Sequence, residues 1–214
     1  HQGELELTRQ LASDLVSSMN GVDGDLDAVL VAASGCGHTM KAYDELLNED
    51  LQFRAPVLDV QEFLADRGLS ETFTSQLQPL PEAVAMHDAC HMIHGQNIQT
   101  QPRALLRAIP GIQLREAIEA GVCCGSAGIY NLVQPDEAAE LGRIKAADLS
   151  STGAGIVASA NIGCPLQLRR HLGDRAEVLH PMQLLAASAG LHPLPGVAQG
   201  VGTAEVSGKR KDRQ

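Results

Sequence analysis

The sequence predicts an α/β fold with a mainly parallel sheet and flanking helices. Short apolar runs alternate with helix-like stretches along most of the chain, an alternation typical of βαβ units. Glycine and proline, the residues that most often end or begin such elements, separate the runs. The expected strands are 26–33, 55–58, 83–87, 112–117, 155–160 and 177–180.

The expected helices fill the intervals between these strands. Leucine recurs on one side of segment 3–19, and acidic residues stand in the first turn of segment 136–149, where they offset the positive end of the helix dipole. The run 26–33 is apolar enough to predict a strand buried on both faces. Segment 70–81 is polar, holds two prolines and is expected to be a connector. Further helices are expected to include Lys41 to Leu47, to span 60–67 and 181–189, and to begin at Pro102 and Pro165.

Charge and composition exclude several classes of protein. The formal net charge is −10, and the only basic cluster, at 209–213, lies in a polar tail, so a nucleic-acid surface is not expected. No apolar run approaches the length of a membrane span, and no signal peptide is visible. The odd count of five cysteines fits a reducing compartment with metal or redox chemistry. We therefore expect a cytoplasmic location.

The cysteines follow a pattern that predicts a shared site. The adjacent pair Cys123-Cys124 is flanked by one distant cysteine on each side, Cys90 and Cys164. Adjacent cysteines do not easily bond to each other. Cys36, Cys90 and Cys164 each follow a predicted strand, and parallel strands end at one edge of a sheet, so we expect the thiols to gather there. Helices that start at this edge would favour thiolate. Four unrelated buried thiols, a zinc site and free redox thiols are the alternatives.

An internal repeat is the second strong signal. Segment 29–36 aligns with 157–164, and both of these segments end in Gly-Cys. Segment 57–64 aligns with 178–185. This predicts two pseudo-repeated βαβα units, the first truncated: residues 1–80 as the back half of one unit, 81–194 as a complete unit, and 195–214 as a disordered tail. The partners of Cys36 would then precede residue 1. Chance similarity between two ordinary βα turns is the alternative.

Several motifs in order resemble one known family. Segments 87–91, 101–106 and 123–131, together with the two Gly-Cys turns, are similar to the cysteine-rich CCG domain, and most similar to iron–sulfur subunits of glycolate oxidase. The resemblance covers about residues 3–191. The general CCG pattern ends in Cys-x-x-Cys, whereas this chain has Gln167 three residues after Cys164. This departure puts in doubt the noncubane clusters and disulfide cleavage of heterodisulfide reductase, another protein with the domain.

The resemblance implies a set of site residues. A [4Fe–4S] cluster, the ordinary partner of four thiolates, would be held by Cys90, Cys123, Cys124 and Cys164. Cys36 would be a ligand of the first unit's cluster. Gly125 and Gly128 would let the backbone approach the cluster. His87, His91 and His94 flank Cys90 and are expected to donate hydrogen bonds to sulfur, and so tune the cluster, or to cap a helix; a ligand or proton-transfer role is the alternative.

The resemblance also implies a function. A partner flavoprotein carrying the flavin would oxidise glycolate or a similar 2-hydroxy acid, and this chain would be the electron-transfer subunit that passes electrons to an acceptor such as quinone. Peripheral association with the inner face of the cell membrane would fit that task. A thiol–disulfide reductase of the heterodisulfide type, a cysteine-based redox sensor and a structural zinc domain are the alternatives.

Overall fold

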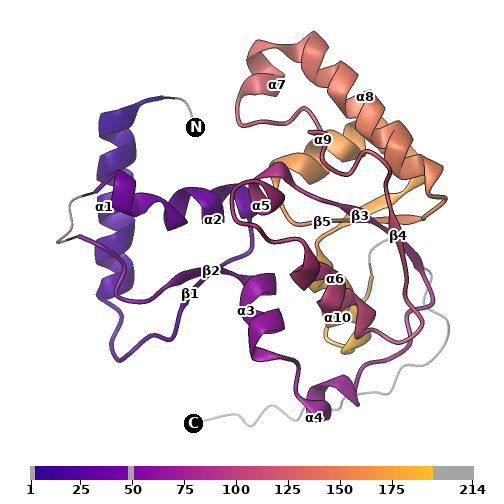
Figure 1. Cartoon of the computed structure of the whole chain (residues 1–214), viewed down its shortest axis with the longest axis horizontal. Coiled ribbons are helices and arrows are strands. Elements are labelled where there is room, and N and C mark those ends of the chain that lie inside the picture. The colour runs from indigo at the N-terminus through magenta and orange to yellow at the C-terminus, as the bar shows by residue number, and fades with distance from the viewer. Residues whose placement is uncertain (1–2, 48–50, 195–214) are drawn as a thin grey trace, which may run out of the picture.

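The computed structural model describes residues 3–47 and 51–194, which form two parallel sheets flanked by helices (Figure 1). The predicted tail 195–214 lies outside the described residues. The first sheet pairs β1 (Val29–Val31) with β2 (Val57–Asp59). The second sheet has the order β4-β3-β5-β6, with bounds Gln113–Glu116, Ala83–His87, Ile156–Ser159 and Glu177–Leu179. The α/β class with parallel strands is confirmed, but the strands divide between two sheets where one was predicted.

At least one helix lies between each described strand and the next. The α-helices are α1 (Leu5–Asn20), α2 (Ser34–Lys41), α3 (Val60–Arg67), α4 (Glu71–Thr74), α5 (Cys90–Ile93), α6 (Thr100–Arg107), α7 (Tyr130–Val133), α8 (Pro135–Ser151), α9 (Gly163–Leu172) and α10 (Pro181–Ser188); two 3₁₀ turns are η1 (Tyr43–Glu45) and η2 (Gly173–Arg175). The segment 70–81, predicted to be a connector, contains α4. The Ser70 hydroxyl starts this helix by accepting a hydrogen bond from Phe73 N at 3.2 Å.

The second sheet is buried between two layers of helices. Strand residues alternate between its faces. Ala85, Val157 and Val178 share a buried cluster with α8 and α9, whereas Val84 and Ile156 share another with α6 and α10. In Figure 1, α8 and α9 accordingly lie above this sheet and α6 and α10 below it. This second half of the molecule, residues 81–194, has a core on both faces of its sheet.

The first sheet is not buried in this way, so the predicted burial of 26–33 on both faces is wrong. Leu30, in the middle of β1, is 47% exposed. Within the described residues, only β2 pairs with β1, so the other edge of β1 has no neighbouring strand. On α1, Ala12 and Val16 are buried while Leu11 is 59% exposed. The first half, residues 3–80, therefore leaves much of its apolar surface uncovered.

The two halves nevertheless pair their strands in the same register. Val29 lies opposite Val57 in the first sheet, and Val157 lies opposite Val178 in the second. These are the same residues that the sequence alignment makes equivalent. The two pairings support the proposed repeat of units, which itself stays a prediction, as do the domain boundaries.

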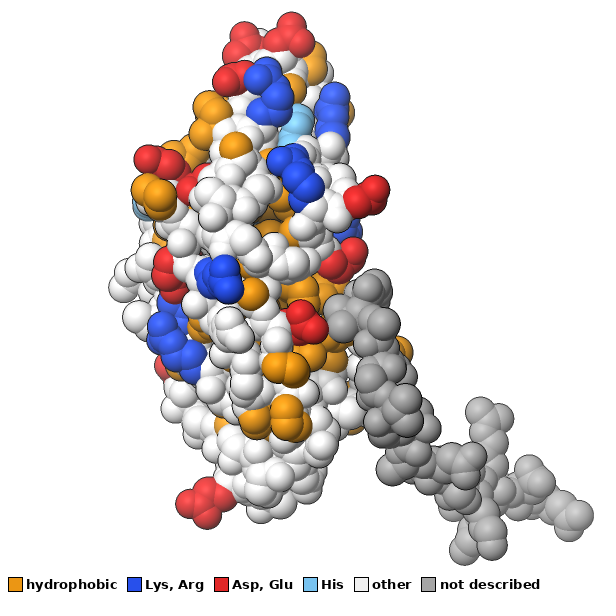
Figure 2. Space-filling view, turned by 90° about the vertical axis from the view of Figure 1, so that its right-hand side faces the viewer, with side chains coloured by type: hydrophobic (Ala, Val, Ile, Leu, Met, Phe, Trp, Pro, Cys, Tyr) orange, Lys and Arg blue, Asp and Glu red, His pale blue; other side chains and the backbone are white. Residues whose placement is uncertain are grey.

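The surface carries mixed charges. On the face seen in Figure 2, Lys and Arg side chains are scattered among Asp and Glu side chains and form no basic patch. Among the helices of residues 3–47 and 51–194, none is long and apolar enough to cross a membrane.

Candidate metal centre

Four thiols from three segments lie in contact at the carboxyl ends of the strands. Cys90 begins α5, three residues after the end of β3. Cys164 is the second residue of α9, which follows β5, and Cys123-Cys124 lie in the loop between β4 and α7. Hydrogen bonds join Cys90 to Cys123, Cys123 to Cys124, and Cys124 to Cys164. We call this connected set the thiol chain. Cys124 and Cys164 are buried, and Cys90 and Cys123 are half-buried.

The hydrogen bonds divide the thiol chain into donors and acceptors. Donation to Cys123 raises the pKa of both Cys90 and Cys124, whereas accepting hydrogen bonds from Cys124 and Cys90 lowers the pKa of Cys123. The hydrogen bond from Cys124 likewise lowers the pKa of Cys164. Both effects favour ionisation of Cys123 and Cys164, and a soft cation would stabilise the thiolate form of all four cysteines.

His87, at the end of β3, lies against the thiol chain. One of its ring nitrogens and the sulfurs of Cys124 and Cys164 all lie within 4.8 Å of one another. Its Nδ1 is 2.9 Å from the Ser159 hydroxyl. Burial lowers the pKa of His87 to about 4, so the ring is neutral at physiological pH. His87 is thus placed either to donate a hydrogen bond to sulfur or to add a nitrogen ligand.

The loop that carries the cysteine pair depends on Gly125. Its N–H donates to Cys123 Sγ at 3.4 Å, and its φ of +85° is in the left-handed region. A Cβ at this position would lie 2.3 Å from the carbonyl oxygen of Ala138 in α8. The glycine therefore allows both the turn and the close approach of the loop to α8. Gly128 also has a positive φ (64°) but is exposed.

Two residues of α8 that the sequence analysis missed fix the start of this loop. Lys145 is only 1% exposed, and its ammonium donates to the carbonyls of Glu119 and Ala120. Asp148 accepts from the backbone N–H groups of Ile118 and Glu119, at 3.0 and 3.1 Å. Burial lowers the pKa of Lys145, while the negative charges of nearby groups, Asp148 first, act in the opposite direction. In the sequence these two residues look like an ordinary surface pair on a helix, so no signal could have found them.

A buried ion pair holds the segment of Cys90. The Arg103 guanidinium binds both carboxylate oxygens of Asp88, at 2.9 and 2.8 Å, and both oxygens of Glu116, at 2.9 and 2.6 Å. Arg103 comes from α6, Asp88 follows β3 and Glu116 ends β4. This fork-to-fork geometry locks three elements together beside Cys90, and it gives Asp88 and Arg103, of the motifs at 87–91 and 101–106, a structural role.

The remaining predicted site residues lie outside the thiol chain or at its margin. His91 pairs with His38 of α2, with the two Nδ1 atoms 2.9 Å apart, and burial lowers its pKa. His94 is exposed. Cys36, the third residue of α2, is exposed and is not part of the thiol chain. Gln167 is buried and donates to Ala138 O at 2.9 Å, so the side chain that replaces the family's extra cysteine joins α9 to α8.

Comparison with known proteins identifies the domain. Residues 84–169 match the family model described as the cysteine-rich domain CCG. This chain belongs to the CCG family. The matched segment contains all members of the thiol chain as well as His87, Arg103 and Gly125. The CCG domain thus supplies every contact described above between these side chains.

Curated relatives extend the similarity over most of the chain. A probable glycolate oxidase iron–sulfur subunit of Bacillus subtilis is 31% identical over 206 residues, which cover 89% of this chain and 45% of that protein. A subunit of the fumarate reductase (CoM/CoB) of Methanothermobacter marburgensis is 30% identical, over 86% of this chain and 36% of that protein. The glycolate oxidase iron–sulfur subunit of Escherichia coli is 30% identical, over 77% of this chain and 40% of that protein.

The chain thus spans less than half the length of these three relatives. A glutamate racemase from Bacillus anthracis matches 88% of the chain and 65% of its own, with a TM-score of 0.39 and 12% identity, which is too weak to support any inference.

Proposed function

We propose that the thiol chain holds an iron–sulfur cluster and that this chain serves electron transfer. The contact of four thiols from three separate segments carries the proposal. Thiolate is the soft, anionic ligand that iron–sulfur clusters use, and four thiolates are the ordinary complement of a [4Fe–4S] cluster. Cys90, Cys123, Cys124 and Cys164 would be the ligands. The names of the relatives from Bacillus subtilis and Escherichia coli, both glycolate oxidase iron–sulfur subunits, support the same group.

The surroundings of the thiol chain suit such a group. Two N–H donors point at sulfur, Gly125 N at Cys123 and Asn161 Nδ2 at Cys164, each at 3.4 Å. Hydrogen bonds to ligand sulfurs stabilise negative charge and so tune reduction potential. Lys145 adds a buried cation behind the loop of the cysteine pair. When bound, the cluster supplies one-electron redox chemistry, while these residues hold the ligands, stabilise charge and restrict access of water.

The proposal also covers the complex in which this chain would act. By similarity to the glycolate oxidase subunits, a partner flavoprotein oxidises glycolate or a similar 2-hydroxy acid, and this chain carries the electrons onward to an acceptor such as quinone. Cys36 is not part of the thiol chain, so by this similarity it would serve a second cluster only together with ligands from elsewhere. A thiol–disulfide reductase is the second candidate, because the lowered pKa of Cys123 is what a nucleophilic thiolate needs.

Metal and acid-labile sulfide analysis of anaerobically purified protein tests the proposal. We expect iron and sulfide in equal amounts, with visible absorption that a reductant bleaches. In Cys124→Ser, iron and sulfide should be lost, because serine is a poor ligand for a soft metal site. Stoichiometric zinc without sulfide would assign a zinc site, and thiols free of metal would favour the reductase. Reduction of the cluster by glycolate only after addition of the flavoprotein would test the complex.

A further inference from the structure

Asn161 connects the thiol chain to the first half of the molecule. It lies between β5 and α9, where its carboxamide makes two hydrogen bonds. Nδ2 donates to Cys164 Sγ at 3.4 Å, and Oδ1 accepts from Gly35 N at 3.2 Å. Because a backbone N–H only donates, the amide oxygen must face Gly35, and this leaves the amino group for sulfur. A single side chain thus joins a proposed ligand to the start of α2.

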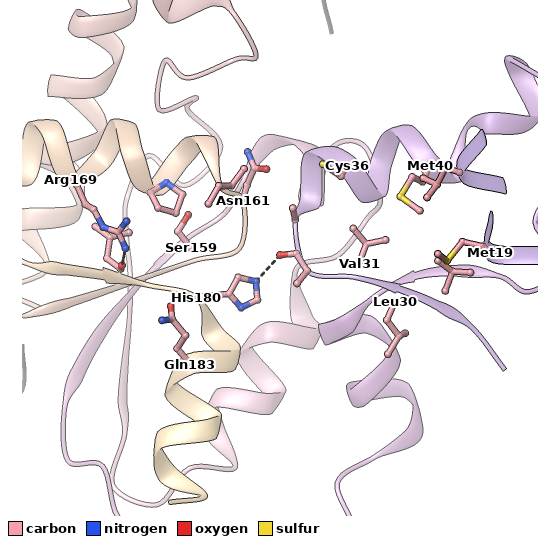
Figure 3. Close-up of a pocket in the computed structure, with 17 residues that line it drawn as sticks. Met19, Leu30, Val31, Cys36, Met40, Ser159, Asn161, Arg169, His180 and Gln183 are labelled. Atoms are coloured by element: carbon pink, nitrogen blue, oxygen red, sulfur yellow. Dashed lines mark hydrogen bonds between the residues drawn. The ribbon is translucent and has the colours of Figure 1, made fainter. Parts of the chain in front are cut away.

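The start of α2 is built to receive this contact. The first backbone N–H groups of a helix have no acceptor within the helix. Here two of them find acceptors across the junction: Ser34 N donates to Ala160 O at 3.1 Å, and Gly35 N donates to Asn161. A Cβ on Gly35 would lie only 3.2 Å from Asn161 Oδ1. Figure 3 shows Asn161 beside the first turn of α2, which carries Cys36.

A second tether reaches the same turn from the segment of Cys90. Gln96 Nε2 donates to the carbonyl of Ser34 at 2.9 Å and to the carbonyl of His91 at 3.3 Å. His91 is the residue next to Cys90. The first turn of α2 is therefore tied to the segments of two proposed ligands, by Asn161 on one side and by Gln96 on the other.

We propose that Asn161 is a positioning residue that couples metal binding at the thiol chain to the order of the first turn of α2. Metal bound at the four cysteines fixes Cys164 Sγ in one position as a thiolate acceptor, so the hydrogen bond from Asn161 Nδ2 is held more firmly. Loading therefore fixes the carboxamide, which in turn holds Gly35 N–H more firmly and orders the residue next to it, Cys36. By linkage, loosening α2 weakens metal binding by the same factor. The inference deepens the proposed function, since it needs metal at the four cysteines, but any thiolate-binding metal suffices.

Amide hydrogen exchange of Gly35 in the isotopically labelled protein, followed by NMR, tests this coupling. The probe is one equivalent of Zn²⁺ added anaerobically to the metal-free protein, because zinc is diamagnetic and binds four thiolates. In the unmodified chain we expect Zn²⁺ to slow the exchange of Gly35 at least about fivefold, the lower end of typical coupling between sites. The amide of Val157, in the buried core, reports global unfolding in every sample.

Two substitutions separate the two hydrogen bonds. Asn161→Ala removes both, so Gly35 should exchange faster and Zn²⁺ should no longer slow it. Asn161→Asp keeps an oxygen for Gly35 but removes the donor to Cys164, so Gly35 should stay protected while the response to saturating Zn²⁺ is lost. Ile162→Ala is the control, because this neighbouring residue is 69% exposed. It should respond to Zn²⁺ as the unmodified chain does.

The outcomes distinguish this inference from the proposed function. If Zn²⁺ binds without changing Gly35 exchange, or if Asn161→Ala and Asn161→Asp respond as the unmodified chain does, the coupling is wrong, whatever the iron analysis shows. If Zn²⁺ slows the exchange but the purified protein contains no iron and sulfide, the coupling holds and the proposed function fails.

Discussion

The two halves of the molecule use the same local topology with different results. The first half runs β1-α2-β2-α3 and the second runs β5-α9-β6-α10, with two parallel strands in each. Cys36 and Cys164 each lie five residues after the last residue of the preceding strand, in the first turn of a helix. Yet every residue of β5 is buried, whereas β1 is half-buried at its ends and exposed at Leu30.

The difference comes from neighbours and not from the strands themselves. β5 has β6 on one edge and β3 on the other, and helices cover both faces of its sheet. In the part of the chain that the structure describes, β1 has β2 alone. A cavity of about 560 Å³ lies along β1, and its apolar lining includes Leu15, Met19, Met40, Ile162 and Pro165 (Figure 3). A strand's burial thus depends on elements that its own sequence does not contain.

The same contrast applies to the cysteines. Cys164 interacts with Cys124, and Cys124 interacts with Cys123. They are neighbours because the loop after β4 lies at the carboxyl end of β5. Cys36 occupies the corresponding turn without such neighbours among the described residues and is exposed. Equivalent turns therefore give a candidate ligand set in one half and a single thiol in the other.

Replacing each of these two cysteines gives the largest expected difference between the halves. Cys164→Ser should lose nearly all iron and sulfide, because it removes one of four soft ligands. Cys36→Ser, the matched control, should keep the iron and sulfide of the unmodified chain. Both are measured on anaerobically purified protein. Equal loss in the two variants would place Cys36 at the same site and remove the difference between the two turns.

The next largest difference concerns how much one ion pair in each half contributes to the free energy of unfolding. Arg103→Met leaves the carboxylate of Asp88 buried without its partner, since that side chain is 3% exposed, and should cost about 3–5 kcal/mol of unfolding free energy. In the first half, Lys41 binds Glu62 at 2.5 Å, but these side chains are 25% and 18% exposed. Lys41→Met should cost about 1 kcal/mol or less. Denaturant unfolding compares them, and similar losses would contradict the expected difference in burial.

The sequence predicted those features that local pattern determines. Segments 83–87 and 60–67 were predicted with the bounds that β3 and α3 have, because apolar runs and a final glycine mark them clearly. Gly68 ends α3 with a φ of 73°, a conformation that favours glycine. The candidate site was also predictable, since parallel strands bring the residues that follow them to one edge.

Features that depend on partners far along the chain were not predictable. The burial of β1 needed a neighbouring strand, and the role of Lys145 needed the loop at 119–120 to fold over it. His91 gave no sign that His38, 53 residues earlier, would be its partner. Spacing indicated the four cysteines, but only the folded chain shows which of their side chains interact with each other.

Two glycines in the cysteine loop of the second half sharpen the contrast in packing. Gly125→Ala forces a side chain into a left-handed turn and against Ala138 O, so we expect a loss of about 2–4 kcal/mol in unfolding free energy. A Cβ at Gly121, four residues earlier, would meet nothing within 4 Å. Gly121→Ala should therefore change stability by no more than about 0.5 kcal/mol. Denaturant unfolding of both variants measures this. A stable Gly125→Ala protein would show that the loop does not need to approach α8.

The smallest effect concerns two equivalent helix caps. Asp59 starts α3 by accepting from Gln61 N at 2.8 Å, and His180 starts α10 by accepting from Met182 N at 3.1 Å. Glu62 and Gln183 complete a capping box in each case. Burial raises the pKa of Asp59 and lowers the pKa of His180, because it disfavours the charged form of both. Hydrogen bonds from Gln61 and the charges of His180 and Lys41 partly offset the effect at Asp59, and Ala32 O and Asp59 partly offset it at His180.

The signs of the pH dependence are therefore opposite. The pKa of Asp59 is raised in the folded state, so its contribution to stability is complete below its ordinary pKa of 3.8 and is lost as pH rises through the folded-state pKa. The pKa of His180 is lowered, so its contribution is complete above its ordinary pKa of 6.5 and is lost as pH falls through the folded-state pKa. In Asp59→Asn the new side chain still caps the helix, with a contribution to stability within about a few tenths of a kcal/mol of that of aspartate. It should thus gain relative stability towards neutral pH, and His180→Asn should gain it towards acid. Unfolding free energies measured from about pH 3 to 8, which includes the ordinary pKa of both groups, give the two slopes. If the stability changes of the two variants depended on pH with the same sign, burial would not be the main cause of the pKa shift at one of the two caps.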